Sequence, residues 1–119
     1  MILPGQEQTR QEVLRAITVY SRYNLQFKEL SPQNANIADI VFMFIKGLHA
    51  DGTIFHGRGL EKGHSYFPPN GEVHFNDHEN FSLEKGDYTT SLFYVALHEM
   101  GHVLGLIHSR MSAAVMAGR

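Results

Sequence analysis

Three histidines and one glutamate form the part of this sequence best suited to chemistry. The pattern HExxHxxGxxH places its histidines at His98, His102 and His108, and Glu99 follows the first of them. Side chains four residues apart on a helix project from one face and can reach a single ion. Gly105 would end that helix and let the third histidine approach from another direction. Five fixed identities make a chance match rarer than about one in a million per starting position.

These residue types predict a catalytic zinc ion. Three protein ligands leave one tetrahedral position open, which distinguishes a catalytic zinc from a structural one. Zinc lowers the pKa of its bound water and polarises a carbonyl, while Glu99 would take the water's proton and deliver it to the leaving amine. No covalent intermediate is needed, in keeping with a chain that has no cysteine. Ordinary histidines on a helix are the alternative, and the rarity of the full pattern favours the metal.

Two helices must hold and support these residues. The motif helix is predicted from Ser91 to Leu104, with capping residues between Asp87 and Thr90. An amphipathic helix is predicted upstream from Gln8 to about Asn24, because apolar residues recur there at steps of three and four. Thr9 is its expected cap, and Glu12 would complete a capping box.

Four short segments are predicted as strands because they alternate or are densely apolar. They are Leu25–Leu30, Ala38–Ile45, Ser65–Phe67 and Glu72–Asn76. The rest of the glycine-rich stretch from Gly47 to Gly71 is predicted as loop. With no repeat and no linker, the order of helix, strands and helix predicts one α+β domain over residues 1–119.

Composition narrows the function further. A net charge of −2 gives no electrostatic case for nucleic acid or a membrane surface. No apolar run approaches the roughly 20 residues that span a bilayer, and the first residues do not fit a secretory signal. Eight histidines without any cysteine suggest that metal, in place of disulfides, stabilises this small domain.

The sequence after the third histidine resembles the matrixin branch of the metzincins, the matrix metalloproteinases. Ser109 directly follows His108, whereas astacins, reprolysins and serralysins have Glu, Asp or Pro there. The resemblance implies that Met116 forms the methionine turn beneath the zinc; routine core packing is the alternative for this residue. It extends from about residue 9 to Met116. It implies a zincin-like α+β fold with a mixed, mostly parallel twisted sheet that lacks the family's first strand and last helix.

Upstream segments extend the resemblance to a second zinc. His49-Ala50-Asp51-Gly52 is similar to the family's HGDG segment, and residues 72–81 are similar to AHFDxDExW. The resemblance implies a structural zinc held by His49, Asp51, His64 and His74. Three imidazoles and one carboxylate would close a tetrahedral shell with no open position. Solvated loop histidines are the alternative.

The family also binds calcium through carboxylates and loop carbonyls, and here the sequence departs from it. His56 and Asn76 stand where the family has aspartates, while Glu79 matches. The loss of two anionic oxygens should weaken calcium binding. Asp39 matches a second family calcium site. Solvated surface carboxylates are the alternative for Asp39 and Glu79.

The resemblance implies a monomeric, extracellular zinc endopeptidase that cleaves peptide bonds in matrix proteins. Substrate would lie extended beside an edge strand near Ser65–Phe67, in contact with Tyr66. Val95 and His98 would line the inner side of the S1′ specificity pocket. A non-catalytic zinc-binding fragment of a matrixin is the alternative, because the first strand, the outer pocket wall and the last helix are expected to be missing. The intact Glu99 favours the enzyme.

Overall fold

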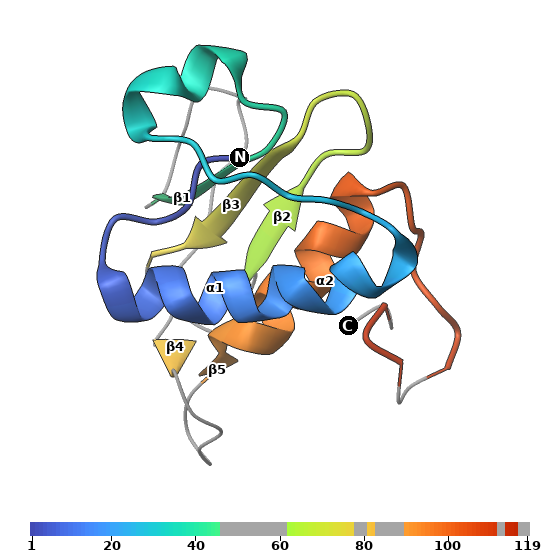
Figure 1. Cartoon of the computed structure of the whole chain (residues 1–119). Helices are drawn as coiled ribbons and strands as arrows, with labels where there is room; N and C mark the ends of the chain where they lie inside the picture. The colour runs from blue at the N-terminus through green and yellow to red at the C-terminus, as the bar shows by residue number, and fades with distance from the viewer. Residues whose placement is uncertain (46–61, 78–80, 83–89, 112–113, 117–119) are drawn as a thin grey trace.

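The computed structural model describes residues 1–45, 62–77, 81–82, 90–111 and 114–116. Its elements follow the order helix, strands, helix, as Figure 1 shows. They are α1 (Glu7–Tyr20), the 3-10 helices η1 (Ser21–Tyr23) and η2 (Pro32–Ile37), β1 (Val41–Ile45), β2 (Gly63–Ser65), β3 (Glu72–Asn76), β4 (Phe81–Ser82), β5 (Thr90–Ser91) and α2 (Leu92–Val103). This composition confirms the predicted α+β class.

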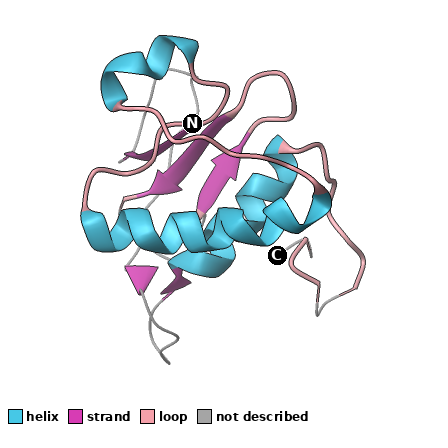
Figure 2. Ribbon diagram, viewed as in Figure 1, coloured by secondary structure: helices cyan, strands magenta, loops and turns pink. Residues whose placement is uncertain are grey.

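The central sheet is mixed and has the strand order β1-β3-β2 (Figure 2). β1 runs parallel to β3, with Val41 opposite Glu72. β2 runs antiparallel to β3, with His64 opposite His74. β4 and β5 form a separate parallel pair. Within the described residues the outer edge of β2 has no strand beside it.

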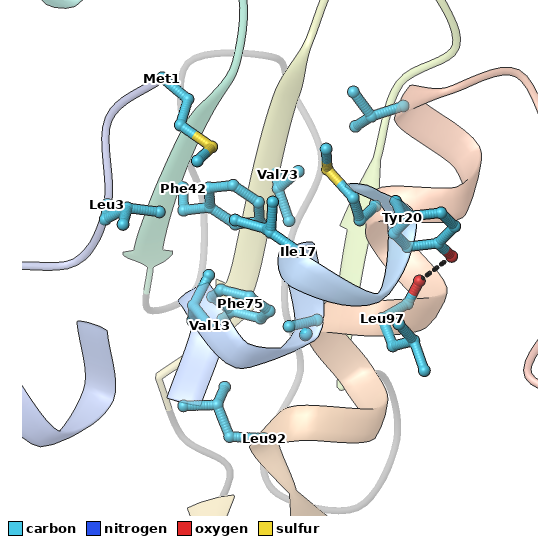
Figure 3. Packing of buried hydrophobic residues seen from close by; sticks show 14 residues of the cluster. Met1, Leu3, Val13, Ile17, Tyr20, Phe42, Val73, Phe75, Leu92 and Leu97 are labelled. Carbon is cyan, nitrogen blue, oxygen red and sulfur yellow. Dashed lines mark hydrogen bonds between the residues drawn. The ribbon is translucent and has the colours of Figure 1, made fainter. Parts of the chain in front are cut away.

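The hydrophobic core lies between α1, the sheet and α2 (Figure 3). Buried residues recur along α1 at steps of three and four, which is the spacing of one helix face. They meet aromatic and β-branched side chains from the sheet and the apolar side of α2. The most deeply buried of these side chains are Val13, Ile17, Val73, Phe75, Leu92 and Met100. Burial of one side of α2 leaves its other side for polar residues.

The N-terminal residues pair with β1, although no strand was predicted before α1. Ile2 forms an isolated parallel bridge with Val41. The carbonyl oxygen of Met1 accepts from the backbone N–H of Leu30 at 2.7 Å. Met1 and Ile2 are both buried. This segment therefore continues the sheet by a single bridge beside β1.

The prediction of a strand at Leu25–Leu30 was wrong. These residues form no regular element, and Leu25 is exposed. Alternation predicts a strand only where a neighbouring strand can supply backbone partners and a face can be buried. Here Phe27 and Leu30 are only half-buried.

The predicted capping box of α1 was also wrong. The helix begins at Glu7, and its N-cap is Gln6, whose side chain makes no capping hydrogen bond. Thr9 therefore lies inside the first turn and has no terminal N–H group to cap. Glu12 instead forms an ion pair with Arg15 one turn later.

The other strand predictions fared better. Glu72–Asn76 was predicted with the bounds that β3 has, and β1 lies inside the predicted Ala38–Ile45. β2 was predicted two residues late, as Ser65–Phe67. Because β3 begins at Glu72, the antiparallel register leaves Phe67 without a partner on β3. Residues 46–61, most of the predicted loop, lie outside the described residues.

The helix predicted to carry the motif is confirmed. α2 begins and ends one residue inside its predicted bounds. Its cap is Ser91, whose hydroxyl oxygen accepts from the backbone N–H of Tyr94 at 3.3 Å. The cap was predicted just upstream, where Thr90 belongs to β5 and residues 83–89 lie outside the described part. Neither α1 nor α2 has the length and apolar character that crossing a membrane requires, and the described residues hold no other α-helix.

Candidate active site

α2 presents two of the motif histidines on the side that the core leaves uncovered. Leu92, Ala96 and Met100 are buried at four-residue steps. His98 and His102 lie off this stripe and are only partly buried. The same helix geometry that buries the apolar residues therefore places both imidazoles side by side.

The three motif histidines converge in space. His102 Nε2 lies 3.2 Å from His98 Nε2 and 3.1 Å from His108 Nε2. The three nitrogen atoms lie within 4.8 Å of one another. A tetrahedral ion with zinc–nitrogen bonds of about 2.0–2.1 Å holds its ligand atoms roughly 3.3 Å apart. The spacing of the nitrogens fits a zinc ion.

Backbone carbonyls fix the orientation of two of these rings. His98 Nδ1 lies 2.7 Å from Val115 O, and His102 Nδ1 lies 2.8 Å from Leu106 O. A carbonyl oxygen only accepts, so each Nδ1 must carry a hydrogen, and in the neutral ring Nε2 then keeps its lone pair. Lone pairs that converge at about 3 Å repel one another unless a cation lies between them. This donor set fits a bound metal ion.

The chain turns sharply after α2 so that His108 can reach the other two histidines. Gly105 adopts a φ of +99°, in the left-handed region that favours glycine. Its N–H donates to His102 O, and the N–H of Leu106 donates to Gly101 O, both at 2.9 Å. These bonds satisfy the last carbonyls of the helix.

Met116 packs against α2 at Gly101, the residue before His102. Met116 is 9% exposed, and a Cβ on Gly101 would collide with its sulfur. The carbonyl of Met116 accepts from the N–H of Ser109. Since the preceding Val115 accepts from His98, this short turn supports the metal-facing side of α2 from below.

Glu99 is held beside the histidines by the edge strand. Its side chain is largely buried, with 7% of the residue exposed. The Ser65 hydroxyl donates to Glu99 Oε1 at 2.8 Å. At Gly63, a Cβ would lie 3.6 Å from Glu99 Cγ and 3.4 Å from a methyl group of Val95. β2 therefore runs close along the helix that carries the motif.

The structure brings together two of the four residues predicted for the second zinc. His64 and His74 face each other across β2 and β3, with Nε2 of His64 3.0 Å from Nδ1 of His74. His74 is buried, and its Nε2 lies 3.6 Å from Glu72 Oε1. The other two predicted ligands, at positions 49 and 51, lie outside the described residues.

The two residues predicted to bind substrate lie in different surroundings. Val95 is half-buried on α2, one turn before Glu99 and against β2. The ring of Tyr66 instead packs edge-on against His64 and His74, each at 5.7 Å between centroids. Its hydroxyl is buried without a hydrogen-bond partner in the described part of the chain. Tyr66 thus lies beside the second histidine cluster.

The residues predicted for the two calcium sites lie in different parts of the sheet. Asp39 is exposed just before β1, while Asn76 is fully buried at the end of β3. The parallel pairing of Val41 with Glu72 places these two residues at opposite ends of β3, so each would belong to its own calcium site. The third residue, at position 79, lies outside the described residues.

Two residues near the motif were missed from the sequence, Ser65 and Phe67. Ser65 contacts Glu99, and the ring of Phe67 packs edge-on against His102 at 5.5 Å between centroids. Side chains alternate between faces along an extended chain. That alternation could have revealed them, because it places residues 65 and 67 on one side and Tyr66 on the other.

The fold and the three converging histidines define a metallopeptidase-like domain of the metzincin kind. The family profile described as Matrixin matches residues 3–118. The chain therefore belongs to the matrixin family, as the resemblance predicted.

Similar proteins share this stretch over only a part of their own length. The chain is 39% identical to the hatching enzyme of Paracentrotus lividus over 94% of this chain and 19% of that protein. It is 34% identical to matrix metalloproteinase-23 of Mus musculus, over 92% of this chain and 31% of the relative. Stromelysin-3 of Rattus norvegicus is 39% identical, over 93% of this chain and 22% of the relative. The chain thus spans less than a third of each of these relatives.

Proposed function

We propose that this chain is a zinc-dependent metalloendopeptidase that hydrolyses peptide bonds in extracellular matrix proteins, with Glu99 as general base. One observation carries the proposal. The Nε2 atoms of His98, His102 and His108 converge on one point, and Glu99 follows the first of these ligands on the same helix. Three ligands leave one position for solvent, which an enzyme needs and a closed structural site lacks.

The outer edge of β2 supplies a place for substrate. An extended peptide can add to an unpaired strand edge through main-chain hydrogen bonds. Val95 and Phe67 offer apolar contacts on the same side, since Val95 packs near β2 and Phe67 packs on His102. Val95 would form the inner side of the pocket for the side chain that follows the cleaved bond. This arrangement would bring the cleaved carbonyl to the histidines.

Glu99 would move the protons of the reaction. Zinc, when bound by the three histidines, lowers the pKa of a ligated water and polarises a carbonyl. Glu99 accepts a proton from the attacking water and then donates it to the leaving amine nitrogen. Burial beside β2 keeps its carboxylate close to this path and away from bulk solvent.

We include the second zinc in this proposal, with His49, Asp51, His64 and His74 as its ligands. The close approach of His64 to His74 supports it, because two imidazole nitrogens 3.0 Å apart suit either a shared proton or a shared cation. A closed shell of four protein ligands would tie β2 and β3 to the segment before them. This site would stabilise the fold without taking part in hydrolysis.

Other parts of the proposal rest on the family alone. They are extracellular localisation, matrix proteins as substrates, a monomeric state and weak calcium binding. The names of two relatives, stromelysin-3 and matrix metalloproteinase-23, are consistent with an enzyme that acts on protein.

Cleavage of a quenched fluorescent peptide tests the proposal. The zinc-loaded chain should cleave it, and Glu99→Ala should lower kcat by about 10²- to 10⁴-fold while the zinc content stays the same. Glu7→Ala removes an exposed glutamate on α1 and is the matched control. Metal analysis should find about two zinc ions per chain. Zinc-loaded protein without turnover would instead identify a non-catalytic zinc-binding fragment, and less than one zinc per chain would contradict both functions.

A further inference from the structure

The Ser65 hydroxyl is a polar group at the site to which the proposed mechanism gives no task. Ser65 Oγ lies 2.8 Å from Glu99 Oε1 and 3.0 Å from Glu99 O. A carboxylate and a backbone carbonyl only accept, so the hydroxyl is the donor in both contacts. One hydroxyl proton can therefore serve either oxygen by rotation about the Cβ–Oγ bond.

Ser65 occupies a fixed position because it is part of a sheet. It pairs with Val73 in the antiparallel register of β2 and β3. Two residues before it, a Cβ on Gly63 would lie 3.6 Å from Glu99 Cγ, and two residues after it the ring of Phe67 packs against His102. Strand β2 and the turn after it thus follow α2 along its metal-facing side. A hydroxyl on a paired strand has a more precisely fixed position than a hydroxyl on a loop.

A glutamate that serves as general base needs this kind of restraint. Its side chain has three rotatable bonds, and proton transfer requires an oxygen about 2.6–3.2 Å from the reacting atom. A donor bound to one oxygen fixes the plane of the carboxylate and leaves the other oxygen available. Within the described residues, no second side chain donates to the carboxylate of Glu99.

We propose that Ser65 is a positioning residue for Glu99: its hydroxyl binds Oε1 and leaves Oε2 to exchange protons with water and the leaving amine. The inference rests on the proposed function. No bond to Ser65 is made or broken in the reaction. When Oε2 carries the proton, the hydroxyl can stay on Oε1 or turn to the carbonyl of Glu99, 0.2 Å more distant (3.0 against 2.8 Å), without movement of the strand.

Two substitutions at this position test the inference. Ser65→Ala should lower kcat about tenfold with KM nearly unchanged, because a hydrogen bond to a charged group is lost while the substrate edge remains. Ser65→Thr keeps the hydroxyl and suits a strand, so it should restore kcat to within about threefold of the parent. Ser21→Ala is the matched control, since it removes an exposed serine hydroxyl that also donates to a carbonyl.

The zinc content of each variant should match the parent, and the thermal midpoint of each variant should stay above the assay temperature, although Ser65→Ala loses a hydrogen bond. An unchanged kcat for Ser65→Ala, or a rise in KM alone, would overturn the inference and leave the proposed function intact. Absence of turnover in the parent would instead contradict the proposed function.

Infrared spectroscopy gives a second readout that does not depend on turnover. In the parent and in each Ser65 variant, subtraction of the spectrum obtained with Glu99→Gln isolates the carboxylate band of Glu99. This band should shift in Ser65→Ala and return to its parent position in Ser65→Thr. A band that does not move in Ser65→Ala would overturn the inference even if the threonine variant folds poorly.

Discussion

The two histidine clusters of this domain are built in different ways. The first takes two ligands from one helix and the third from the turn directly after it. The second takes His64 and His74 from neighbouring strands, and its two remaining predicted ligands lie at positions 49 and 51. The first cluster rests on the core through α2 and Met116, whereas the second lies across the sheet, at the pairing of β2 with β3.

This difference indicates which of the two clusters needs a bound metal to hold its ligands in place. Spacing along a helix brings His98 and His102 together whenever the helix forms, because helix geometry sets the distance between them. A site assembled from distant segments gains its geometry only when those segments are held together, so its binding energy adds to folding stability. We therefore expect the first zinc to govern activity and the second to govern stability.

The largest expected effect comes from removal of a ligand on the helix. His102→Ala should lower kcat/KM by at least about 10³-fold, because metal-assisted attack is lost. One zinc per chain should remain, and in metal-free buffer the thermal midpoint should change little because His102 lies off the buried side of α2. Peptide cleavage and metal analysis check both parts. Loss of both ions would show that the two clusters are not independent.

Removal of a histidine from β2 or β3 should instead lower stability and leave the catalytic zinc in place. With free zinc at about a thousandfold its dissociation constant, the second site should contribute about 4 kcal/mol to the free energy of unfolding. His74→Ala should abolish this zinc-dependent increment while the folded protein keeps its catalytic zinc. Urea unfolding with and without zinc measures it, and His64→Ala should behave alike since the two residues are opposite each other. A variant that still binds two zinc ions would contradict the assignment.

A smaller effect is expected beneath the first cluster. Met116→Ala should lower the free energy of unfolding by about 2–3 kcal/mol, because a buried side chain leaves a space below Gly101. Met116→Leu conserves volume and should cost less than about 1.5 kcal/mol. The alanine variant should also bind the first zinc about tenfold more weakly, since the turn carries the carbonyl that orients His98. Competition with a chromophoric chelator measures this, and equal zinc affinities in both variants would contradict it.

The smallest effect concerns the contact between the two helices. Figure 3 shows the hydrogen bond from the Tyr20 hydroxyl to Leu97 O, whose two oxygen atoms lie 2.6 Å apart. Tyr20→Phe should lower the free energy of unfolding by about 1 kcal/mol at neutral pH, as measured by urea unfolding.

Alkaline pH should reduce the difference in the free energy of unfolding between the parent and Tyr20→Phe. Burial, with a smaller contribution from Tyr23, raises the pKa of Tyr20 above its ordinary value of 10.0. Because the folded-state pKa is the higher one, the contribution of Tyr20 is fully present below pH 10.0 and is lost as pH rises through the folded-state pKa. The parent should therefore lose its advantage over Tyr20→Phe above that pH. A gap that widens there would contradict the assigned direction.

Local patterns predicted the helix-borne site well. The spacing of His98 and His102 and the stop at Gly105 are set by neighbours in sequence, and α2 begins and ends within one residue of its prediction. β3 was found because Val73 and Phe75 alternate with polar residues, although the structure buries both sides of this strand. These features can be predicted without knowing which distant segments pack against them.

Features that depend on distant partners were harder to predict. Leu25–Leu30 alternates like a strand, but among the described residues no strand lies beside it to complete a ladder. The contact of Ser65 with Glu99 joins residues 34 positions apart, and strand parity alone could have suggested it only after β2 was placed beside α2. The parallel bridge of Ile2 to Val41 has no signature in the sequence, because it involves backbone groups alone.

The carbonyls behind His98 and His102 also affect how quickly a metal ion can enter. Each ring already carries its hydrogen on the nitrogen that faces the backbone, so neither must flip or exchange tautomers before it binds. At His98 and His102, metal binding therefore does not wait for a slow rearrangement of the side chain. The pace of metal uptake should then be set by how readily the incoming ion sheds its own hydration shell.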